Sequence, residues 1–521
     1  MTTQGNASGG ESRRRFLARC TGCALAASCG VTTIGRAARA QAPATTPGAK
    51  RPKVRVIFSH IPPGSPTWPF INYDYEPRKE TILRALKAGC PEVEFLPATS
   101  HGAAETKAVI ASDKDVDGIM GIAVGCWTGS LSTVLASGKP AVIVDDLYGG
   151  SGEFLTTYAG TKRSGRDFVG VSSSRLDDVV TAARCFATIK EPGAVATFNA
   201  RCREAVRKTY GKECDVACAP GDAAPKVDTS ACLAGLKESA ILLIGSPMHA
   251  IAAQIQQTFG TRVIPIDYKP LDAAYKAADR DEARAIADRW IKGAEAVIEP
   301  STDDVVKSAA MYLAMKSLMK QNHADAITIN CLGGFYGGHM GAYPCLGFCQ
   351  FNDDGLVGAC EADMQSTITM LAMKHLVGRP GYISDPVIDT SKNQIIYAHC
   401  VATRKVFGPA GPSNPYQIRS HSEDRKGASL RSLLPLGHMT TSIELSPVRK
   451  QILMHQGKTV ANVDDDKACR TKLAATVKGD IEKLLCEWDQ WGWHRVTFYG
   501  DLKDPICEFA DRIGFKVVQE A

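Results

Sequence analysis

The sequence lacks any long hydrophobic run. Hydrophobic residues make up 44% of its 521 positions and charged residues 22%, a balance typical of a chain that buries a core. Spanning a bilayer takes roughly 18 to 20 continuous apolar residues. No segment reaches that length, so we expect no membrane span in the mature chain. A chain this long exceeds one ordinary domain, and two or three domains are expected.

The sequence also has little net charge outside its first 40 residues. The formal charge is +6, and residues 1–40 hold six Arg and one Glu, so the remainder is nearly neutral. A nearly neutral chain lacks the broad basic surface that binds nucleic-acid phosphates. We therefore expect no nucleic-acid partner.

Two common kinds of site motif are missing as well. The glycine-rich segment 333–341 fits neither the G-x-G-x-x-G nor the P-loop pattern, so it predicts no nucleotide and is expected to form a flexible wall of a crevice. The sequence has eighteen cysteines, and beyond residue 40 they lack the tight C-x2-C pairs that favour zinc. Three of them lie in residues 1–40, which leaves an odd number in the rest of the chain. The sequence does not decide whether Cys202, Cys214, Cys218 and Cys232 form one or two disulfides.

The amino end has the features of an export leader. Arginines and Phe-Leu in residues 12–17 are followed by a weakly apolar run over 20–35 and by Ala38-Arg39-Ala40 before Gln41. This order is typical of a twin-arginine signal peptide with an A-x-A cleavage site, which predicts a periplasmic or extracellular protein. The alternatives are a basic disordered tail or a lipoprotein signal ending at Cys29.

Strands and helices alternate along most of the remaining chain, which predicts parallel βαβ units. The fold class is therefore α/β, with two tandem Rossmann-like α/β domains followed by a smaller β-rich C-terminal domain. Within the second domain we expect a strand over residues 194–198 and a helix over 201–210. The predicted parts are a signal peptide (1–40), a linker (41–52), a first α/β domain (53–171), a second α/β domain carrying Glu361 (172–376) and a β-rich domain carrying Asp385 and His494 (377–521).

Acidic residues follow two neighbouring apolar runs near the end of the second domain. The run over 356–360 ends at Glu361, Asp363 comes two residues later, and a predicted helix reaches Leu376 before the next run ends at Asp385. Groups at the carboxyl ends of strands line the ligand crevice of open α/β sheets. Singly, these acids could instead pair with an arginine, cap the helix or start a turn.

Two histidines can complete such a site. His399 follows the predicted strand 394–398, and His494 lies in the tryptophan-rich segment 488–494. Carboxylates with an imidazole suit Mn²⁺ or a similar divalent cation. A histidine beside aromatic residues can equally be a packed core residue.

Taken together, these segments resemble the L-fucose isomerase family (L-fucose/L-arabinose isomerase-like). Glu361 and Asp385 are 24 residues apart, Asp363 falls on the family's Asp, and residues 374–378 match the end of its helix. Trp491-Gly492-Trp493-His494 resembles its closing segment, although Trp493 stands where the family has Asn. The resemblance is specific in residues 326–385 and 488–518 only.

The resemblance implies a metal-dependent aldose–ketose isomerase acting on a deoxy- or pentose-type sugar through an enediol. It implies Mn²⁺, or another divalent cation, held by Glu361, Asp385 and His494. Glu361 and Asp385 also act as the acid/base pair. Asp363 does not bind the metal but orients a ligand or a metal-bound water, and His399 is a reserve ligand. It also implies a homo-oligomer, a trimer or hexamer. The alternatives are an exported sugar-binding protein, a catalytically degenerate homologue, or an epimerase on the same scaffold.

Overall fold

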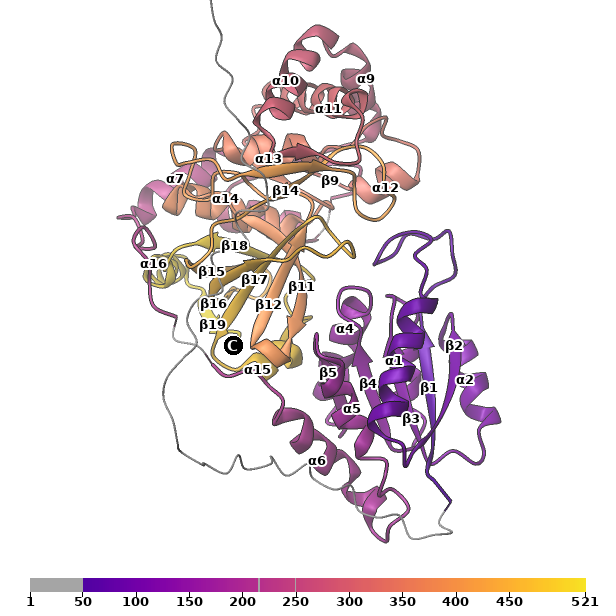
Figure 1. Cartoon of the computed structure of the whole chain (residues 1–521). Coiled ribbons are helices and arrows are strands. Elements are labelled where there is room, and N and C mark those ends of the chain that lie inside the picture. The colour runs from indigo at the N-terminus through magenta and orange to yellow at the C-terminus, as the bar shows by residue number, and fades with distance from the viewer. Residues whose placement is uncertain (1–49, 214–215, 249) are drawn as a thin grey trace, which may run out of the picture. The chain divides into compact units, whose positions relative to one another are not determined.

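The computed structural model describes residues 50–213, 216–248 and 250–521, and it is a mixed α/β structure with a β-rich C-terminal region (Figure 1). The mixed α/β class with parallel sheets, which the sequence predicts, is confirmed. The leader expected at residues 1–40 and most of the linker lie outside the described residues. Within those residues, no helix has both the length and the apolar character needed to cross a membrane.

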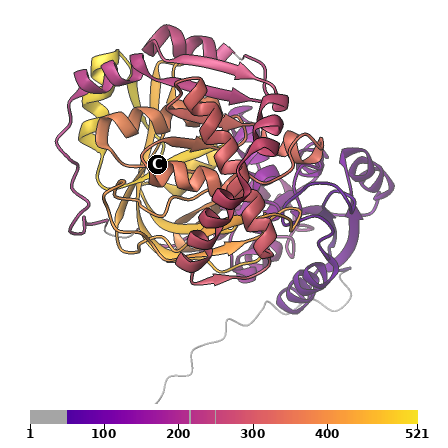
Figure 2. The same ribbon diagram turned by 90° about the horizontal axis from the view of Figure 1, so that it is seen from above.

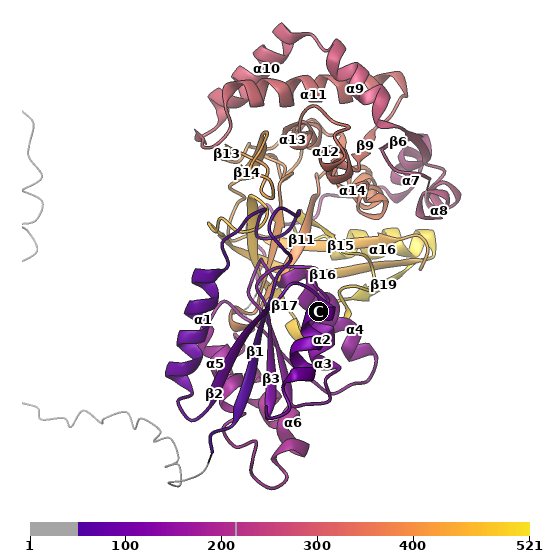
Figure 3. The same ribbon diagram turned by 90° about the vertical axis from the view of Figure 1, so that its right-hand side faces the viewer.

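The first sheet has five parallel strands in the order β2-β1-β3-β4-β5. Helices α1 and α5 lie on one face of it, and α2, α3 and α4 lie on the other (Figure 3). Its elements are β1 (Lys53–Ser59), α1 (Glu76–Gly89), β2 (Glu94–Ser100), α2 (Ala103–Ser112), β3 (Gly118–Ala123), α3 (Ser130–Leu135), β4 (Ala141–Asp145), α4 (Ser151–Arg163), β5 (Val169–Ser172), α5 (Leu176–Arg184) and α6 (Ala194–Arg207).

The strand predicted over residues 194–198 is wrong, because these residues begin helix α6. Phe198, Cys202 and Val206 are buried at four-residue intervals, the spacing of one helical face. Phe198 packs against Phe186, with ring centroids 4.6 Å apart. A short apolar run does not distinguish a strand from a buried helical turn. Here the buried positions Cys202 and Val206, which continue the four-residue spacing from Phe198, favour the helix.

The second sheet has four parallel strands in the order β10-β9-β6-β7. Helices α9, α10 and α11 pack on one another beside it (Figure 2). The elements are α7 (Thr229–Glu238), β6 (Ala240–Ile244), α8 (Ala250–Phe259), β7 (Arg262–Ile266), α9 (Tyr268–Ala277), α10 (Arg280–Gly293), α11 (Thr302–Gln321), β9 (Ala326–Ile329), α12 (Cys331–Tyr336), α13 (Cys345–Asp353), β10 (Val357–Ala359) and α14 (Met364–Val377).

The third sheet is largely antiparallel, in the order β15-β18-β11-β12-β17-β16-β19, and β15 also pairs with β16, so six strands close on themselves. A small sheet joins β8, β13 and β14. The elements are β8 (Ala296–Val297), β11 (Tyr382–Asp389), a 3-10 turn (Thr390–Lys392), β12 (Gln394–His399), β13 (Tyr416–Arg419), β14 (Ser429–Ser432), β15 (Met439–Ser446), β16 (Gln451–Asn462), β17 (Thr471–Lys478), α15 (Ile481–Glu487), β18 (Arg495–Tyr499), α16 (Lys503–Ile513) and β19 (Lys516–Gln519).

A fully buried ion pair fixes the start of β18. Arg495 Nη2 lies 2.6 Å from Glu520 Oε1, and both side chains are inaccessible to solvent. Glu520 also accepts a hydrogen bond from His455 Nδ1 at 2.8 Å. Arg495 donates to the carbonyl oxygen of His494 at 2.8 Å. The pair therefore positions the backbone of a predicted site residue.

We expect Glu520→Gln to lower the free energy of unfolding by about 3–5 kcal/mol, because it leaves the Arg495 charge buried and unpaired. Burial raises the pKa of Glu520, but Arg495 and His455 outweigh it and bring the pKa below its ordinary value of 4.5. The stability from this charge is thus present above pH 4.5 and lost as pH falls below it. Denaturant unfolding followed by circular dichroism should show a difference from the wild type that shrinks below that pH.

Glu508→Gln is the matched control, since Glu508 is exposed on α16. This change should stay within about 0.5 kcal/mol of the wild type. An equal loss in both variants would contradict the role of the buried pair.

Candidate metal centre

The five residues singled out in the sequence come together in the structure. Asp385 lies on β11, which pairs with β12 on one side and β18 on the other. His399 ends β12, and His494 immediately precedes β18. Glu361 lies two residues beyond β10, and Asp363 is the residue before α14. The carboxyl edge of the second sheet and three strands of the closed sheet therefore supply one cluster.

The cluster centres on the Nε2 atom of His494. This atom lies 3.3 Å from Asp385 Oδ1 and 3.5 Å from Glu361 Oε2. His399 Nε2 lies 3.6 Å from Glu361 Oε1. Asp385, His399 and His494 each offer a ligand atom within 4.8 Å of the others, and so do Cys360, Glu361 and His399. The arrangement brings together oxygen and nitrogen donors of the kind that hold a divalent cation.

Hydrogen bonds distinguish the two imidazoles. His494 Nδ1 lies 2.9 Å from Asp363 Oδ2. Because a carboxylate only accepts, Nδ1 carries the proton, and the Nε2 lone pair of the neutral ring is free for a cation. His399 Nδ1 instead accepts from the backbone N–H of Cys400 at 3.0 Å, so its Nε2 holds the proton. His494 therefore fits a ligand better than His399 does.

Both Nε2 atoms are buried and lack a hydrogen-bond partner. A buried polar atom without a partner is costly in free energy and calls for an explanation. At His494 a bound cation would satisfy Nε2, with Glu361 and Asp385 as the other ligands. The residues present therefore fit the divalent metal that the sequence implies.

Asp363 combines two roles that the sequence left as alternatives. Its Oδ1 accepts from the backbone N–H groups of Gln365 and Ser366, each at 2.9 Å, so it caps helix α14. Its Oδ2 holds His494. A capping aspartate with one oxygen to spare can orient a ligand without moving itself.

The charges of the cluster stabilise one another. Burial alone would lower the pKa of His494, but Asp363 and Asp385 raise it well above its ordinary value. Burial tends to raise the pKa of Asp363 and of Asp385, and His494 brings both below the ordinary value. The acids are therefore ionised when His494 is charged. A cation could replace that positive charge.

Glu361 stands on a strained corner of the backbone. Glu361 and Ala362 have φ values of +64° and +53°, which side chains other than Gly rarely adopt. The corner is held by the Ala362 N–H, which donates to the carbonyl of Ile329 at 2.9 Å. Such strain costs of order 1–3 kcal/mol a residue and gathers at functional sites. Here it turns the Glu361 side chain, 30% exposed, toward a cavity.

The cavity has a volume of about 470 Å³, within the usual range for small-molecule sites. Glu361, Asp385 and His399 form part of its wall. Helix α12 forms another part through Leu332, Gly333, Phe335 and Tyr336, so the glycine-rich segment does line the crevice, partly as a helix. Trp68, Trp127 and Trp493 add aromatic surface.

Sequence reasoning missed His421 and Glu423, which line the same cavity. Tyr336 donates to Glu423 at 2.7 Å, and burial raises the pKa of Glu423 to about 7. Burial lowers the pKa of His421, but Asp424 and its neighbours bring it to about 9. The spacing His-x-Glu-Asp was the available signal. It lies in residues 403–438, where the family resemblance is not specific.

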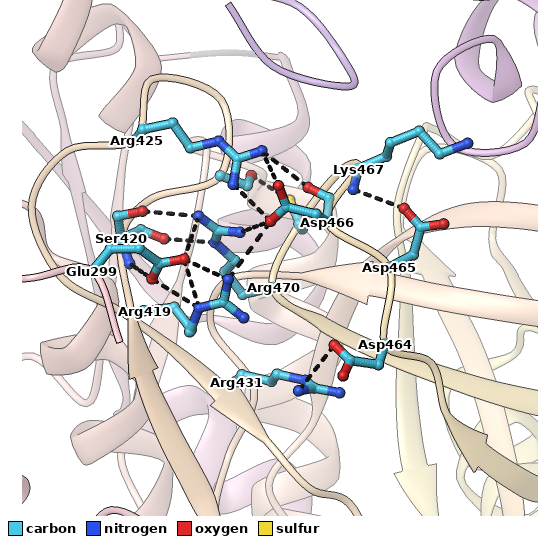
Figure 4. A network of polar contacts seen from close by, with 12 residues as sticks. Glu299, Arg419, Ser420, Arg425, Arg431, Asp464, Asp465, Asp466, Lys467 and Arg470 are labelled. Carbon is cyan, nitrogen blue, oxygen red and sulfur yellow. Dashed lines mark hydrogen bonds and ion pairs between the residues drawn. The ribbon is translucent and has the colours of Figure 1, made fainter. Parts of the chain in front are cut away.

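A network of arginines and acids lies next to the loop that carries His421 and Glu423 (Figure 4). Asp466 lies 2.9 Å from both Arg425 and Arg470. Arg470 also lies 3.5 Å from Glu299, which binds Arg419. The network joins the segment that precedes β17 to the loop carrying His421 and Glu423. The groups pair with one another, so we assign this network to structure.

The cysteines of residues 202–232 that the structure describes form no disulfide. Cys202, Cys218 and Cys232 all have free thiols there, and Cys214 lies outside the described residues. Cys202 and Cys232 are buried separately, in α6 and in α7. Proximity in the sequence did not translate into proximity of these sulfurs.

Comparisons with known proteins point to sugar isomerases. No family model matches the chain. A protein named sulfoquinovose isomerase from Priestia aryabhattai is 28% identical over 213 residues, 40% of this chain and 46% of that protein. One of the same name from Clostridium sp. (strain MSTE9) is 24% identical over 277 residues, 51% of this chain and 60% of that protein. The chain thus spans about half the length of the curated relatives it matches.

Among solved structures, a carbohydrate transporter from Acidothermus cellulolyticus 11B in complex with myo-inositol is 13% identical. The match covers 55% of this chain and 78% of the transporter, with a TM-score of 0.17. A score of this size carries no argument about fold or function.

Proposed function

We propose that this chain is a metal-dependent aldose–ketose isomerase similar to the L-fucose isomerase family. The observation that carries the proposal is the convergence of Glu361 and Asp385 on His494 Nε2 beside a cavity. Relatives named sulfoquinovose isomerase support the reaction class. The substrate class is a monosaccharide: a deoxy- or pentose-type sugar, or one like sulfoquinovose.

The proposed reaction moves a proton between C1 and C2 of the open-chain sugar through an enediol. Glu361 is the base that reaches the substrate, because its side chain is 30% exposed and that of Asp385 only 8%. Asp385 is held by Trp493 Nε1, which donates to it at 2.6 Å, and acts as the second acid/base group. A divalent cation held by Glu361, Asp385 and His494 would stabilise negative charge on the sugar oxygens.

The remaining expectations from the sequence belong to the same proposal. The two parallel sheets are the cores of tandem Rossmann-like domains at 53–171 and 172–376, followed by the β-rich domain at 377–521. The protein is exported by its twin-arginine leader to the periplasm or beyond, and it assembles as a trimer or hexamer. Its metal is Mn²⁺ or a related divalent cation.

Replacing Glu361 with Gln should abolish both metal retention and turnover, because it removes a charged ligand that is also the base. The measurements are manganese per chain by elemental analysis and ketose formation from sulfoquinovose and a panel of aldoses. Deuterium from solvent should enter at C1 or C2 in the wild type. Full activity in Glu361→Gln would overturn the assignment.

Glu423→Gln is the matched control for this experiment. Glu423 lines the same cavity but is not in either ligand group, so this variant should keep its manganese. A wild-type protein that binds sugar without metal and forms no ketose would instead favour the sugar-binding alternative.

Asp363→Asn should weaken metal binding about 10- to 100-fold, because Asp363 fixes the tautomer and orientation of His494. Titration calorimetry with Mn²⁺ measures the change directly. Turnover at saturating Mn²⁺ should largely recover, since Asp363 does not touch the substrate in this proposal. Unchanged affinity in the variant would contradict the role of Asp363 in preparing His494 as a ligand.

A further inference from the structure

Two pairs of cysteines line the candidate cavity, and the proposed reaction uses none of them. Cys331 Sγ and Cys360 Sγ lie 3.0 Å apart, and both residues are buried. Cys400 and Cys469 share the Ser422 hydroxyl, at 3.7 Å from each sulfur. All four residues belong to the wall of the cavity.

The sheet topology explains the closeness of the first pair. Cys360 directly follows β10, and Cys331 comes two residues after β9, at the start of α12. Strands β9 and β10 are parallel neighbours with Thr328 opposite Ala359, so both cysteines lie at the same edge of the sheet. A disulfide has an S–S bond of about 2.05 Å, so closing it takes a movement of about 1 Å.

The pair is also within reach of small reagents. The cavity includes Trp127, which is 58% exposed, and Tyr336, which is 40% exposed. Cys331 and Cys360 both belong to the wall of this cavity, so a small molecule that enters it reaches the surface that they line. The export that the leader predicts would also carry the pair into a compartment where disulfides persist.

We propose that Cys331 and Cys360 are an oxidisable dithiol, which a small-molecule disulfide converts to a disulfide bond tying helix α12 to the corner that carries Glu361. The two strained residues Glu361 and Ala362 follow Cys360 directly. The disulfide would anchor the amino side of this corner. The hydrogen bond from Ala362 to Ile329 already holds its carboxyl side. The proposal does not depend on isomerase activity.

The exchange conserves electrons and atoms. The thiolate of one cysteine attacks a sulfur of the reagent and releases one reagent thiol. The second cysteine then attacks the protein sulfur of the mixed disulfide and releases the other. Two protein thiols are oxidised, the reagent disulfide is reduced, and the two protons pass to the released thiols.

The test uses the full chain, reduced and then treated with bis(2-hydroxyethyl) disulfide. Remaining thiols are alkylated with N-ethylmaleimide in denaturant, and peptides are mapped by mass spectrometry without reduction. We expect the peptides containing Cys331 and Cys360 to be linked, and the link to disappear with dithiothreitol. Full alkylation of both residues after treatment would overturn the proposal, whether or not Cys400 and Cys469 have reacted.

Two variants sharpen the result. Cys360→Ser should lose the link and trap the reagent as a mixed disulfide on Cys331. Cys232→Ser, which removes a thiol buried in the core and bonded to the Ala372 carbonyl, should keep the link. The thermal unfolding midpoint should rise on oxidation in the wild type and in Cys232→Ser only. A midpoint that falls in the wild type would contradict the anchoring role.

Discussion

The structure depends on the mutual neutralisation of buried charges around His494. Asp363 and Asp385 lie on opposite sides of its ring, at 2.9 Å from Nδ1 and 3.3 Å from Nε2. Taking any one of these groups out of water alone would cost several kcal/mol. Together they share one proton, and their attraction offsets the cost of burial. The surrounding strands and turns place each of these side chains next to His494.

Two kinds of sheet position the residues of the site. Parallel strands β9 and β10 end at one edge, which brings Glu361 to the cavity, and the order β18-β11-β12 sets His494, Asp385 and His399 on adjacent strands. The proposed ligands Glu361, Asp385 and His494 come from both sheets. The site therefore exists only where the two meet, and the rigidity of that junction sets the precision of the site. The Arg495–Glu520 pair and the arginine network add to this rigidity.

The sequence predicted the order of most strands and helices and the five residues that cluster, because strand-end acids and their spacing are local signals. It failed at α6, where the short, mostly apolar segment 194–198 suits either a strand or a helix. The family resemblance ranked His494 above His399 as a ligand, but the physical reason was not in the sequence, because it depends on which ring nitrogen faces Asp363 or the Cys400 amide. The place of Glu423 in the cavity wall and the Cys331–Cys360 contact depend on packing between distant segments, which the His-x-Glu-Asp spacing and the cysteine positions do not record.

The distance in sequence between His494 and Glu520 has a consequence for biosynthesis. Arg495 remains unpaired until Glu520 has been made, and β19 must then pair with β16. A nascent chain can fold its first parallel sheet while synthesis continues. The centre around His494 has to wait for residues more than 20 positions further on. Under the proposed function, metal capture would come only after β19, the last strand of the third sheet, has paired.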